Sequence, residues 1–545
     1  MNFDDVLSRI GGFGKFQKTL YVWICLPQIL LAFHMLVSVF TGAVPPHLCR
    51  AAWPPAARPG PNLSFSLSVG PDASPDLSCA APDTLPGVRL NRSATLALTE
   101  GSASRGCRGG WDFSKEVFQS TVATEWNLVC DNAKLNNIGS SIYMLGLLVG
   151  AVLFGALADK YGRRIIILIG LAVQATFGVG AAFAPNFYVY VLLRFVVGTT
   201  ISAVIMNVFV LGTEWTGRKQ RMLAGIITDY FFGFGYILLA GVAYFIRDWR
   251  KLQLAISAPG FLFIFYIWVL PKSARWLMAK QRKKEAMDLI RKAAIANGRP
   301  LAADFELCQE HKDLKDKAEE NKYSVIDLVR TPKMRKQSLI LFYLWFVNVL
   351  VYYGLSLNIS DFGINIYLTQ LIFGLVEMPA RTITLFTLNR SRRISMFSFI
   401  AVGGLACLLT IFIPDELSVL RTVLAMIGKF GITASLSIVY VYSAEIFPTV
   451  VRQNGIGMSS MCARAGGVIA PVIYLLRSYS KGAPMVIFGL CPLLGAGLSL
   501  LLPETANKPL PDTIQDVERG MSSVDTEKMQ EIHFQPCPRN SDVII

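Results

Sequence analysis

The amino-acid sequence predicts an all-α polytopic membrane protein, with twelve transmembrane helices in two groups of six. Three observations support this fold class. Hydrophobic residues make up 53% of the 545 residues and charged residues only 16%, whereas soluble proteins carry about a quarter. Apolar runs of about 20 residues, each long enough to span a bilayer, recur along most of the chain. Short loops rich in Lys and Arg lie between them, which is the pattern typical of the cytoplasmic side.

The basic loops account for the net charge of +15, so we do not expect nucleic acid as a partner. The lipid bilayer is the expected surrounding. Residues 1–18 lack the basic start and small-residue cleavage site of a signal peptide. We therefore predict a cytoplasmic N-terminus and a retained first helix over about 19–42.

A long polar segment over 43–136 follows this helix. It contains two glycosylation sequons, at Asn62 and Asn91. It also contains four of the ten cysteines, which are Cys49, Cys79, Cys107 and Cys130. Sequons and an even number of cysteines together predict a glycosylated, disulfide-bonded extracellular loop. Four cysteines allow three pairings, and the sequence does not choose among them.

Five more apolar runs complete a predicted N-terminal half over 19–271; they cover about 137–158, 165–186, 187–210, 223–246 and 252–271. The hydrophilic segment 272–337, dense in Lys and Arg, predicts a cytoplasmic linker with amphipathic helices. A C-terminal half over 338–503 follows, with runs at about 338–357, 362–388, 394–413, 417–441, 453–477 and 484–503. The polar tail 504–545 is expected in the cytoplasm.

Two cations stand in the apolar stretch from Lys429 to Pro471, namely Lys429 and Arg464. A charge at mid-membrane depth costs about 3 kcal/mol, and by default it marks a substrate path. Arg464 is expected about 12 Å along its helix, which is too deep for its charge to reach the interface. Both residues are candidate substrate ligands. For Lys429 a second role is open, as a cation paired with a carboxylate that holds helices together.

The sequence gives no sign of catalysis. The four histidines do not form a metal-binding cluster, and no Gly-Lys-Ser/Thr loop is present. We therefore predict no catalytic residue, no metal and no cofactor, and a carrier driven by gradients rather than an enzyme.

Two six-helix halves joined by a long basic link form the layout of the major facilitator superfamily, whose substrate site lies near the midplane between the halves. The loop GALADKYGRR resembles the signature loop of that superfamily, with five residues in register: Gly155, Asp159, Gly162, Arg163 and Arg164. We interpret it as a tight turn whose glycine lets helices approach, with an Asp–Arg latch that favours one conformation. The counterpart at 388–393 lacks the glycine and is expected to be weaker.

Further segments are similar to the solute carrier 22 family of organic-ion transporters: TEWNLVCD (124–131), LGTEWTG (211–217), RDWR (247–250), PKSARWL (271–277), VYSAEIFPTVVRQNG (441–455) and LLPET (501–505). The resemblance covers essentially the whole chain. Lys272 departs from it, because the family usually has Glu there. In the turn Glu445–Arg452 we expect a gate, with Glu445 paired to a nearby arginine.

The resemblance implies the organic-anion branch. Members of that branch have Arg at the place of Arg464, where the cation branch has Asp, and Lys or Arg at the place of Arg381. The stretch 352–374 is similar to urate- and nicotinate-exchanging carriers. We therefore expect a plasma-membrane antiporter of small organic anions, such as urate, nicotinate or other aromatic, monocarboxylate or dicarboxylate anions, against an intracellular counter-anion. The alternatives are a cation or carnitine carrier and a non-transporting, receptor-like homologue.

Carboxylates near these cations leave two questions open. Glu377 lies four residues before Arg381 on the same helix face, which permits an ion pair. If they pair fully, Arg381 is structural. Asp229 lies near the middle of the fifth helix. It is either a polar group satisfied by a neighbouring helix or a charge-balancing group in the cavity wall.

Aromatic residues are the expected complement for flat organic anions, because rings stack on rings and Tyr hydroxyls add hydrogen bonds. The candidates are Tyr230, Phe234, Tyr352, Tyr353 and Tyr440. Tyr440 lies eleven residues after Lys429 and therefore nearly on the same helix face.

The chain ends in Ser541-Asp542-Val543-Ile544-Ile545. Apolar residues at the last and third-last positions permit strand addition to a PDZ domain. We expect either such a scaffold contact, which would affect residence at an apical surface, or a tail without a partner.

Overall fold

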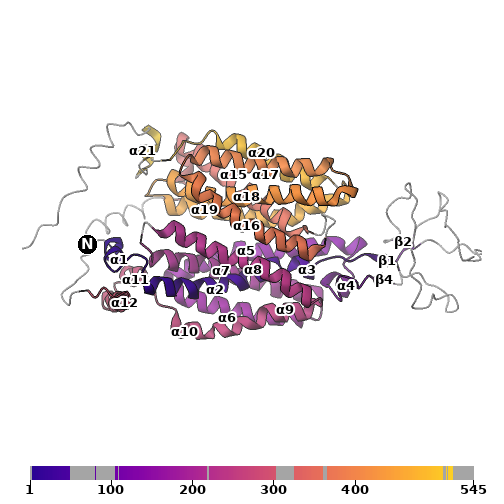
Figure 1. Cartoon of the computed structure of the whole chain (residues 1–545), viewed down its shortest axis with the longest axis horizontal. Helices are drawn as coiled ribbons and strands as arrows, with labels where there is room; N and C mark the ends of the chain where they lie inside the picture. The colour runs from indigo at the N-terminus through magenta and orange to yellow at the C-terminus, as the bar shows by residue number, and fades with distance from the viewer. Residues whose placement is uncertain are drawn as a thin grey trace, which may run out of the picture.

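The computed structural model describes residues 3–49, 80–81, 105–107, 110–217, 220–301, 324–359, 365–480, 482–506, 508, 511 and 513–519. Its helices form two layers with nearly parallel axes (Figure 1). The predicted glycosylation sites Asn62 and Asn91, Cys79 and the PDZ-type C-terminus lie outside the described residues.

The N-terminal layer contains the first group of helices, which are α2 (Lys15–Leu36), α3 (Ser38–Thr41), α5 (Ala133–Tyr161), α6 (Arg163–Ala182), α7 (Phe187–Glu214), α8 (Arg221–Phe245), α9 (Trp249–Ser257) and α10 (Tyr266–Val269). The run predicted as one helix over 252–271 is interrupted by a 3-10 segment, η4 (Ala258–Phe265). Pro259 and Gly260 explain the interruption, because proline removes a backbone donor and clashes with the preceding turn.

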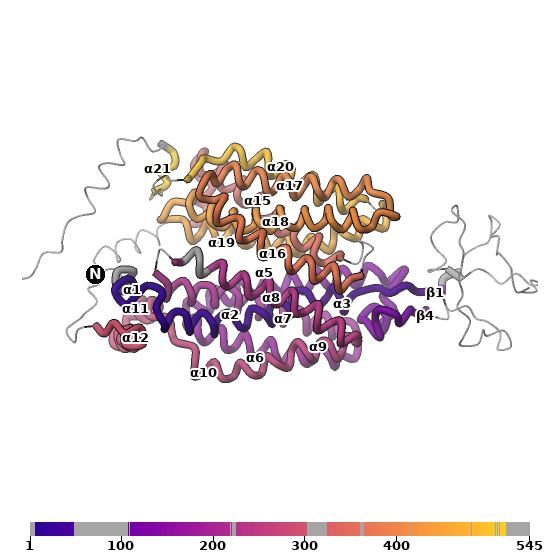
Figure 2. The backbone as a smooth tube through the Cα atoms, viewed as in Figure 1, coloured from indigo at the N-terminus to yellow at the C-terminus, as the bar shows by residue number. Residues whose placement is uncertain are grey.

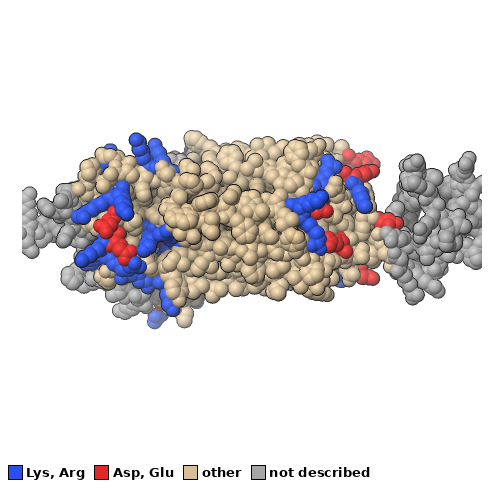
Figure 3. All heavy atoms as spheres, turned by 90° about the horizontal axis from the view of Figure 1, so that it is seen from below, with Lys and Arg blue, Asp and Glu red and all other residues tan. Residues whose placement is uncertain are grey.

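The C-terminal layer contains the second group, which are α15 (Pro332–Leu357), α16 (Ile366–Leu388), α17 (Arg392–Leu409), α18 (Ser418–Ile446), α19 (Arg452–Tyr474) and α20 (Ala483–Ser499), with short 3-10 segments η6 (Thr410–Phe412), η7 (Asp415–Leu417) and η8 (Leu475–Ser478). Among the described residues, eleven helices are long and apolar enough to cross a membrane, and α20 is a shorter apolar helix. On the face shown in Figure 3, an uncharged band separates two ends where Lys and Arg gather.

The short elements divide between the two ends of the bundle (Figure 1). The linker end contains α1 (Phe3–Arg9), α11 (Ala274–Ala279), α12 (Lys283–Ala296), α14 (Asp327–Arg330) and α21 (Ile514–Arg519). The loop end contains α4 (Val122–Glu125), η2 (Cys130–Asn132), the antiparallel pair β1 (His47–Cys49) and β4 (Trp111–Phe113), and the pair β2 (Ala80–Ala81) and β3 (Arg105–Gly106). Cys107 and Cys130 are each disulfide-bonded.

The two halves meet where α5 packs against α19 and α8 against α16, and Figure 2 shows the resulting stack of two layers. At the loop end, Tyr367 of α16 crosses between the halves. Its hydroxyl donates to the Val117 carbonyl at 3.1 Å. Its ring stacks on Phe40, with centroids 5.5 Å apart, and meets Tyr244 edge-on at 5.6 Å. These contacts hold the halves together at this end.

Candidate substrate site

Lys429 lies near the middle of α18, and its side chain is fully buried. Its ammonium is 3.2 Å from Glu377 Oε1 and donates to Ser356 Oγ at 2.5 Å. It also stands 3.2 Å from the centroid of the Tyr352 ring. A buried cation with these partners is already compensated, so Lys429 contributes positive charge through a network rather than as a free ligand.

Arg381 of α16 has two carboxylate partners. One nitrogen lies 3.2 Å from Glu377 Oε2, and the other lies 2.6 Å from Asp229 Oδ2 on α8. The Tyr352 hydroxyl donates to the same Glu377 carboxylate. The predicted pairing within α16 is therefore present, and Asp229 adds a second pairing that joins the two halves. Arg381 is buried, whereas the Asp229 side chain is 48% exposed.

Arg464 differs from the other two cations. It is the thirteenth residue of α19, which corrects its depth from the expected 12 Å to about 18 Å from the start of the helix. Its guanidinium donates to the Ser460 carbonyl at 3.1 Å and to the Ser460 hydroxyl. No carboxylate of a described residue is within ion-pair distance of it. Three cations and two carboxylates therefore leave this site with one excess positive charge.

Aromatic residues surround Arg464. It interacts electrostatically with the hydroxyls of Tyr353 and Tyr440. Tyr440 is 51% exposed although it lies within a helix of the bundle, and its ring meets Trp345 with centroids 4.2 Å apart. Lys429 and Tyr440 lie eleven residues apart on the continuous helix α18 and therefore nearly on one helix face, but Lys429 is fully buried whereas Tyr440 is half exposed.

The remaining predicted aromatics are distributed along the interface between the halves. The Tyr230 hydroxyl is 2.5 Å from Thr382 Oγ1 of the opposite half. Tyr352 is buried in the charge network, with its ring edge-on to that of Tyr353. Phe234 is 47% exposed and contacts Phe231, with ring centroids 6.2 Å apart.

Four residues at the site were not predicted, namely Tyr236, Ser356, Thr382 and Ser460. Tyr236 is fully buried, and its ring centroid lies 5.4 Å from the Lys429 ammonium. The sequence holds a signal for the two serines, because Ser356 follows Tyr352 by four residues and Ser460 precedes Arg464 by four. Tyr236 and Thr382 had no such signal, since their partners lie on other helices.

The predicted latch of the N-terminal half has its ion pair. Arg163 is 2.9 Å from Asp159 and 3.6 Å from Glu214, and Arg164 donates to the Ile267 carbonyl. Gly162 has a φ of +95°, which side-chain-bearing residues rarely adopt, and a Cβ there would lie 3.3 Å from the Trp276 ring. Gly162 therefore makes the turn. The expectation of a helix approach does not apply to Gly155, whose added Cβ would meet nothing within 4 Å.

The corresponding latch of the C-terminal half, which we expected to be weaker, also has an ion pair. Glu445 binds Arg392 with both oxygens, each 3.1 Å from a guanidinium nitrogen, and such a bidentate pair is geometrically specific. Thr505 donates to Glu445 at 2.6 Å. Arg452, also predicted to take part in gating, donates to the Phe447 carbonyl at 3.1 Å. The ion pair between Arg392 and Glu445 thus connects this turn to α18, although the turn lacks the glycine of the first latch.

Glu504 reinforces this latch by capping α17. Its carboxylate accepts from the Ser391 hydroxyl and from the backbone N–H groups of Arg392 and Arg393. Partial burial raises the pKa of Glu504, but hydrogen bonds from Ser391, Arg392 and Ala506 outweigh the burial and hold the pKa at about 2. The carboxylate therefore stays charged at the helix N-terminus, where a negative charge is favoured.

Lys272, which departs from the family pattern, also has a carboxylate partner. Its ammonium lies 3.2 Å from Glu285 of α12. Hydrogen bonds from Arg282 and Lys272 lower the pKa of Glu285. Lys272 therefore forms an ion pair on the linker side even though the family usually has Glu at its position.

Comparison with known proteins places this arrangement among carriers. A family model described as "Sugar (and other) transporter" matches residues 109–515. "Solute carrier family 22 member 13" of Homo sapiens is 40% identical over 97% of this chain and 96% of its own length. "Solute carrier family 22 member 6-A" of Xenopus laevis is 36% identical over 98% and 97%. An "Organic cation transporter protein" of Drosophila melanogaster is 40% identical over 95% of each.

Solved structures of the xylose transporter XylE from E. coli share the fold. An inward-open structure aligns with a TM-score of 0.54 at 18% identity, over 73% of this chain and 92% of that one. A structure bound to 6-bromo-6-deoxy-D-glucose aligns with a TM-score of 0.55 at 18% identity, over 72% and 90%. The predicted major facilitator fold is confirmed, and so is the predicted family resemblance.

Proposed function

The chain belongs to solute carrier family 22, and we propose that it carries small organic anions across the membrane by alternating access of its two halves. It is a membrane transporter and not an enzyme. The observation that carries the proposal is Arg464, a guanidinium deep in the bundle without a carboxylate partner among the described residues. An anionic substrate supplies the missing charge.

The neighbours of Arg464 favour flat, monovalent anions. Tyr353 and Tyr440 border the guanidinium, and the exposed ring of Tyr440 offers a stacking surface. A guanidinium also binds a carboxylate with two parallel hydrogen bonds. The single excess positive charge matches one negative charge on a substrate, which nicotinate carries on its carboxylate and urate on its ring. Nicotinate and urate are therefore the first substrates to test, with exchange for an internal anion as the mode of transport.

The orientation in the membrane follows from the distribution of charge. The linker end contains the basic loops and is assigned to the cytoplasm, together with both termini. The loop end, with its disulfide-bonded cysteines, is assigned to the outside of the plasma membrane. In this orientation the contacts of Tyr367 close the outer side of the carrier.

The test is uptake of labelled nicotinate, urate and tetraethylammonium by cells expressing the wild type, Arg464→Asp or Arg464→Gln, normalised to surface protein. We expect anion uptake by the wild type and at least a tenfold loss in both variants. Arg477→Gln is the matched control, because Arg477 lies exposed in η8 of the same half. Undiminished anion uptake by the Arg464 variants at equal surface level contradicts the proposal.

A cation or carnitine carrier is the second candidate. Two observations favour it. The carboxylate of Asp229 is half exposed, and the Drosophila melanogaster relative is named "Organic cation transporter protein". Tetraethylammonium uptake that is lost in Asp229→Asn and retained in Arg464→Gln would establish it. A receptor-like protein would give no uptake of any of the three compounds while its melting temperature still rises with one of them.

A further inference from the structure

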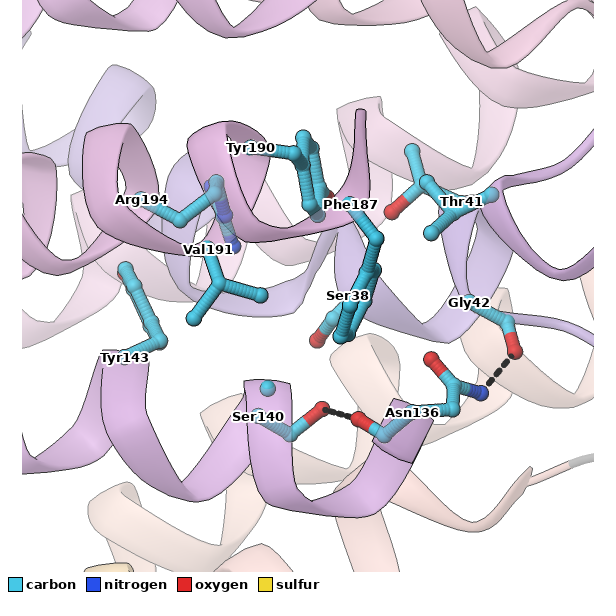
Figure 4. A pocket seen from close by; sticks show the side chains of 12 residues that line it. Ser38, Thr41, Gly42, Asn136, Ser140, Tyr143, Phe187, Tyr190, Val191 and Arg194 are labelled. Atoms are coloured by element: carbon cyan, nitrogen blue, oxygen red, sulfur yellow. Dashed lines mark hydrogen bonds between the residues drawn. The ribbon is translucent and has the colours of Figure 1, made fainter. Parts of the chain in front are cut away.

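A small cavity lies at the loop end of the N-terminal half, between α3, α5 and α7. Its volume is about 20 Å³, which accommodates one particle of roughly the size of a water molecule. Figure 4 shows Arg194 and Tyr143 at one end of it, and Thr41, Gly42 and Asn136 at the other. The cavity is lined by residues of the N-terminal half, whereas Arg464 lies on α19 of the C-terminal half, and the proposed transport function does not use it.

Arg194 is the charged group of this cavity, and it is 3% exposed. One guanidinium nitrogen donates to the His34 carbonyl at 3.0 Å, whereas Nη1 is buried and has no hydrogen-bond partner among the described residues. No carboxylate of a described residue forms an ion pair with it. The guanidinium carbon lies 4.2 Å from the centroid of the Tyr143 ring. A buried cation that lacks a counter-charge is destabilising, and the face of an aromatic ring compensates it only in part.

Tyr143 supplies a second unused donor. Its side chain is 2% exposed, and within the described part of the chain its buried hydroxyl has no hydrogen-bond partner. Two other polar groups of the wall are already engaged, since Asn136 donates to the Gly42 carbonyl at 2.7 Å and Ser140 to the Asn136 carbonyl at 3.3 Å. Phe187 and Val191 form an apolar side of the cavity. One cation and one hydroxyl donor with apolar walls form a site for an anion and not for a metal ion.

We propose that this cavity binds a single monoatomic anion, chloride under physiological conditions, between the Arg194 guanidinium and the Tyr143 hydroxyl. The volume is sufficient for a halide. The bound anion neutralises Arg194. It thereby stabilises the junction of the first, second and fourth membrane helices, because Arg194 of α7 also binds the His34 carbonyl of α2 and Tyr143 belongs to α5.

The experiment is thermal unfolding of the purified full chain in lipid nanodiscs, with sodium gluconate replaced stepwise by sodium chloride at constant ionic strength. We expect the melting temperature to rise by about 2 °C or more, with saturation. Bromide should act in the same way. Tyr143→Phe should weaken the apparent affinity severalfold, and Arg194→Gln should abolish the shift.

Arg464→Gln is the control that separates this site from the transport site, and it should retain the full chloride shift. The proposal is overturned if the wild type shows no chloride-dependent shift, or if the shift disappears in Arg464→Gln and persists in Tyr143→Phe. If Arg194→Gln fails to fold, two other results test the proposal. Tyr143→Phe must weaken the chloride affinity, and a structure determined in bromide must show bromide beside Arg194. Since neither measurement involves transport, failure of the anion-carrier proposal leaves this test intact.

Discussion

At the scale of single residues, Glu377 is the point where the buried charges of the C-terminal half meet. It is fully buried and is bound by Lys429, Arg381 and the Tyr352 hydroxyl. Breaking a buried ion pair by removing one partner costs about 3–5 kcal/mol, because the remaining charge is left uncompensated. Glu377 thus compensates the charge of Lys429 and shares that of Arg381 with Asp229.

We therefore expect Glu377→Gln to lower the free energy of unfolding by about 3 kcal/mol, measured as reduced thermal stability in detergent. The double variant Glu377→Gln/Lys429→Met should recover part of this loss, since it removes the orphaned ammonium together with its partner. Arg381 keeps Asp229 in both variants. Equal stability of the single variant and the wild type would contradict the described network.

The sequence predicted only the parts of this network that lie on one helix. The pairing of Glu377 with Arg381 follows from four-residue spacing. The ion pair between Arg381 and Asp229 joins two residues that are 152 positions apart in the sequence. No local sequence pattern encodes which helices become neighbours. Tyr236 was missed for a related reason, because a buried aromatic in a membrane helix looks like ordinary packing until its cation is known.

At the scale of elements, turns and helix caps at the linker end fix where helices begin. The turn between α5 and α6 depends on the backbone of Gly162, and the start of α17 depends on the carboxylate of Glu504. The sequence signalled the first through its signature loop. The second was not predicted, because the LLPET segment lies more than a hundred residues from the helix that Glu504 caps.

Gly162→Ala should lower stability by about 1–3 kcal/mol, because a side chain at this φ is strained and its Cβ presses on the Trp276 ring. Gly155→Ala is the matched control from the same loop motif, and it should be neutral or slightly stabilising within its helix. Thermal unfolding of both variants measures the difference. A larger loss in Gly155→Ala than in Gly162→Ala would refute this account of the turn.

The cap on α17 predicts a specific pH dependence. The Glu504 pKa is lowered from its ordinary value of 4.5 to about 2, so its contribution to stability is fully present above pH 4.5 and is lost as the pH falls toward 2. The melting temperature of Glu504→Gln should therefore lie below that of the wild type by a constant amount from pH 8 to pH 6. The gap should narrow below pH 4.5. A gap that stays constant down to pH 3 would exclude this origin.

At the scale of the whole molecule, the two halves are joined by contacts that differ in kind. Near the middle, polar contacts link α8 to α16, through Asp229 with Arg381 and through Tyr230 with Thr382. At the loop end the contact is aromatic and centres on Tyr367. The order of the helices and the division into halves followed from hydropathy alone. Which end is closed was not predictable, because it depends on side chains brought together by the packing of the halves.

Tyr367→Ala should shift the population toward a form that is open at the loop end. Ala243 lines a cavity there together with Tyr367 and is 1% exposed, so a cysteine in its place reports opening. We expect Ala243→Cys to react severalfold faster with a membrane-impermeant thiol reagent in the Tyr367→Ala background. Tyr188→Ala, a change at a 73% exposed tyrosine of the same end, should leave the rate unchanged. Equal rates in all three backgrounds would show that Tyr367 does not hold this end closed.

The solitary charge of Arg464 also bears on how fast an unloaded carrier turns around. Closing the halves without a substrate removes water from a guanidinium that has no carboxylate partner among the described residues, and desolvating an unpaired ion is costly. A bound anion removes that barrier, so the loaded carrier should reorient faster than the empty one. Preloading proteoliposomes with unlabelled nicotinate should then accelerate entry of labelled nicotinate several times over. In Arg464→Gln, the remaining rate of entry of labelled nicotinate should not depend on whether the vesicles are preloaded.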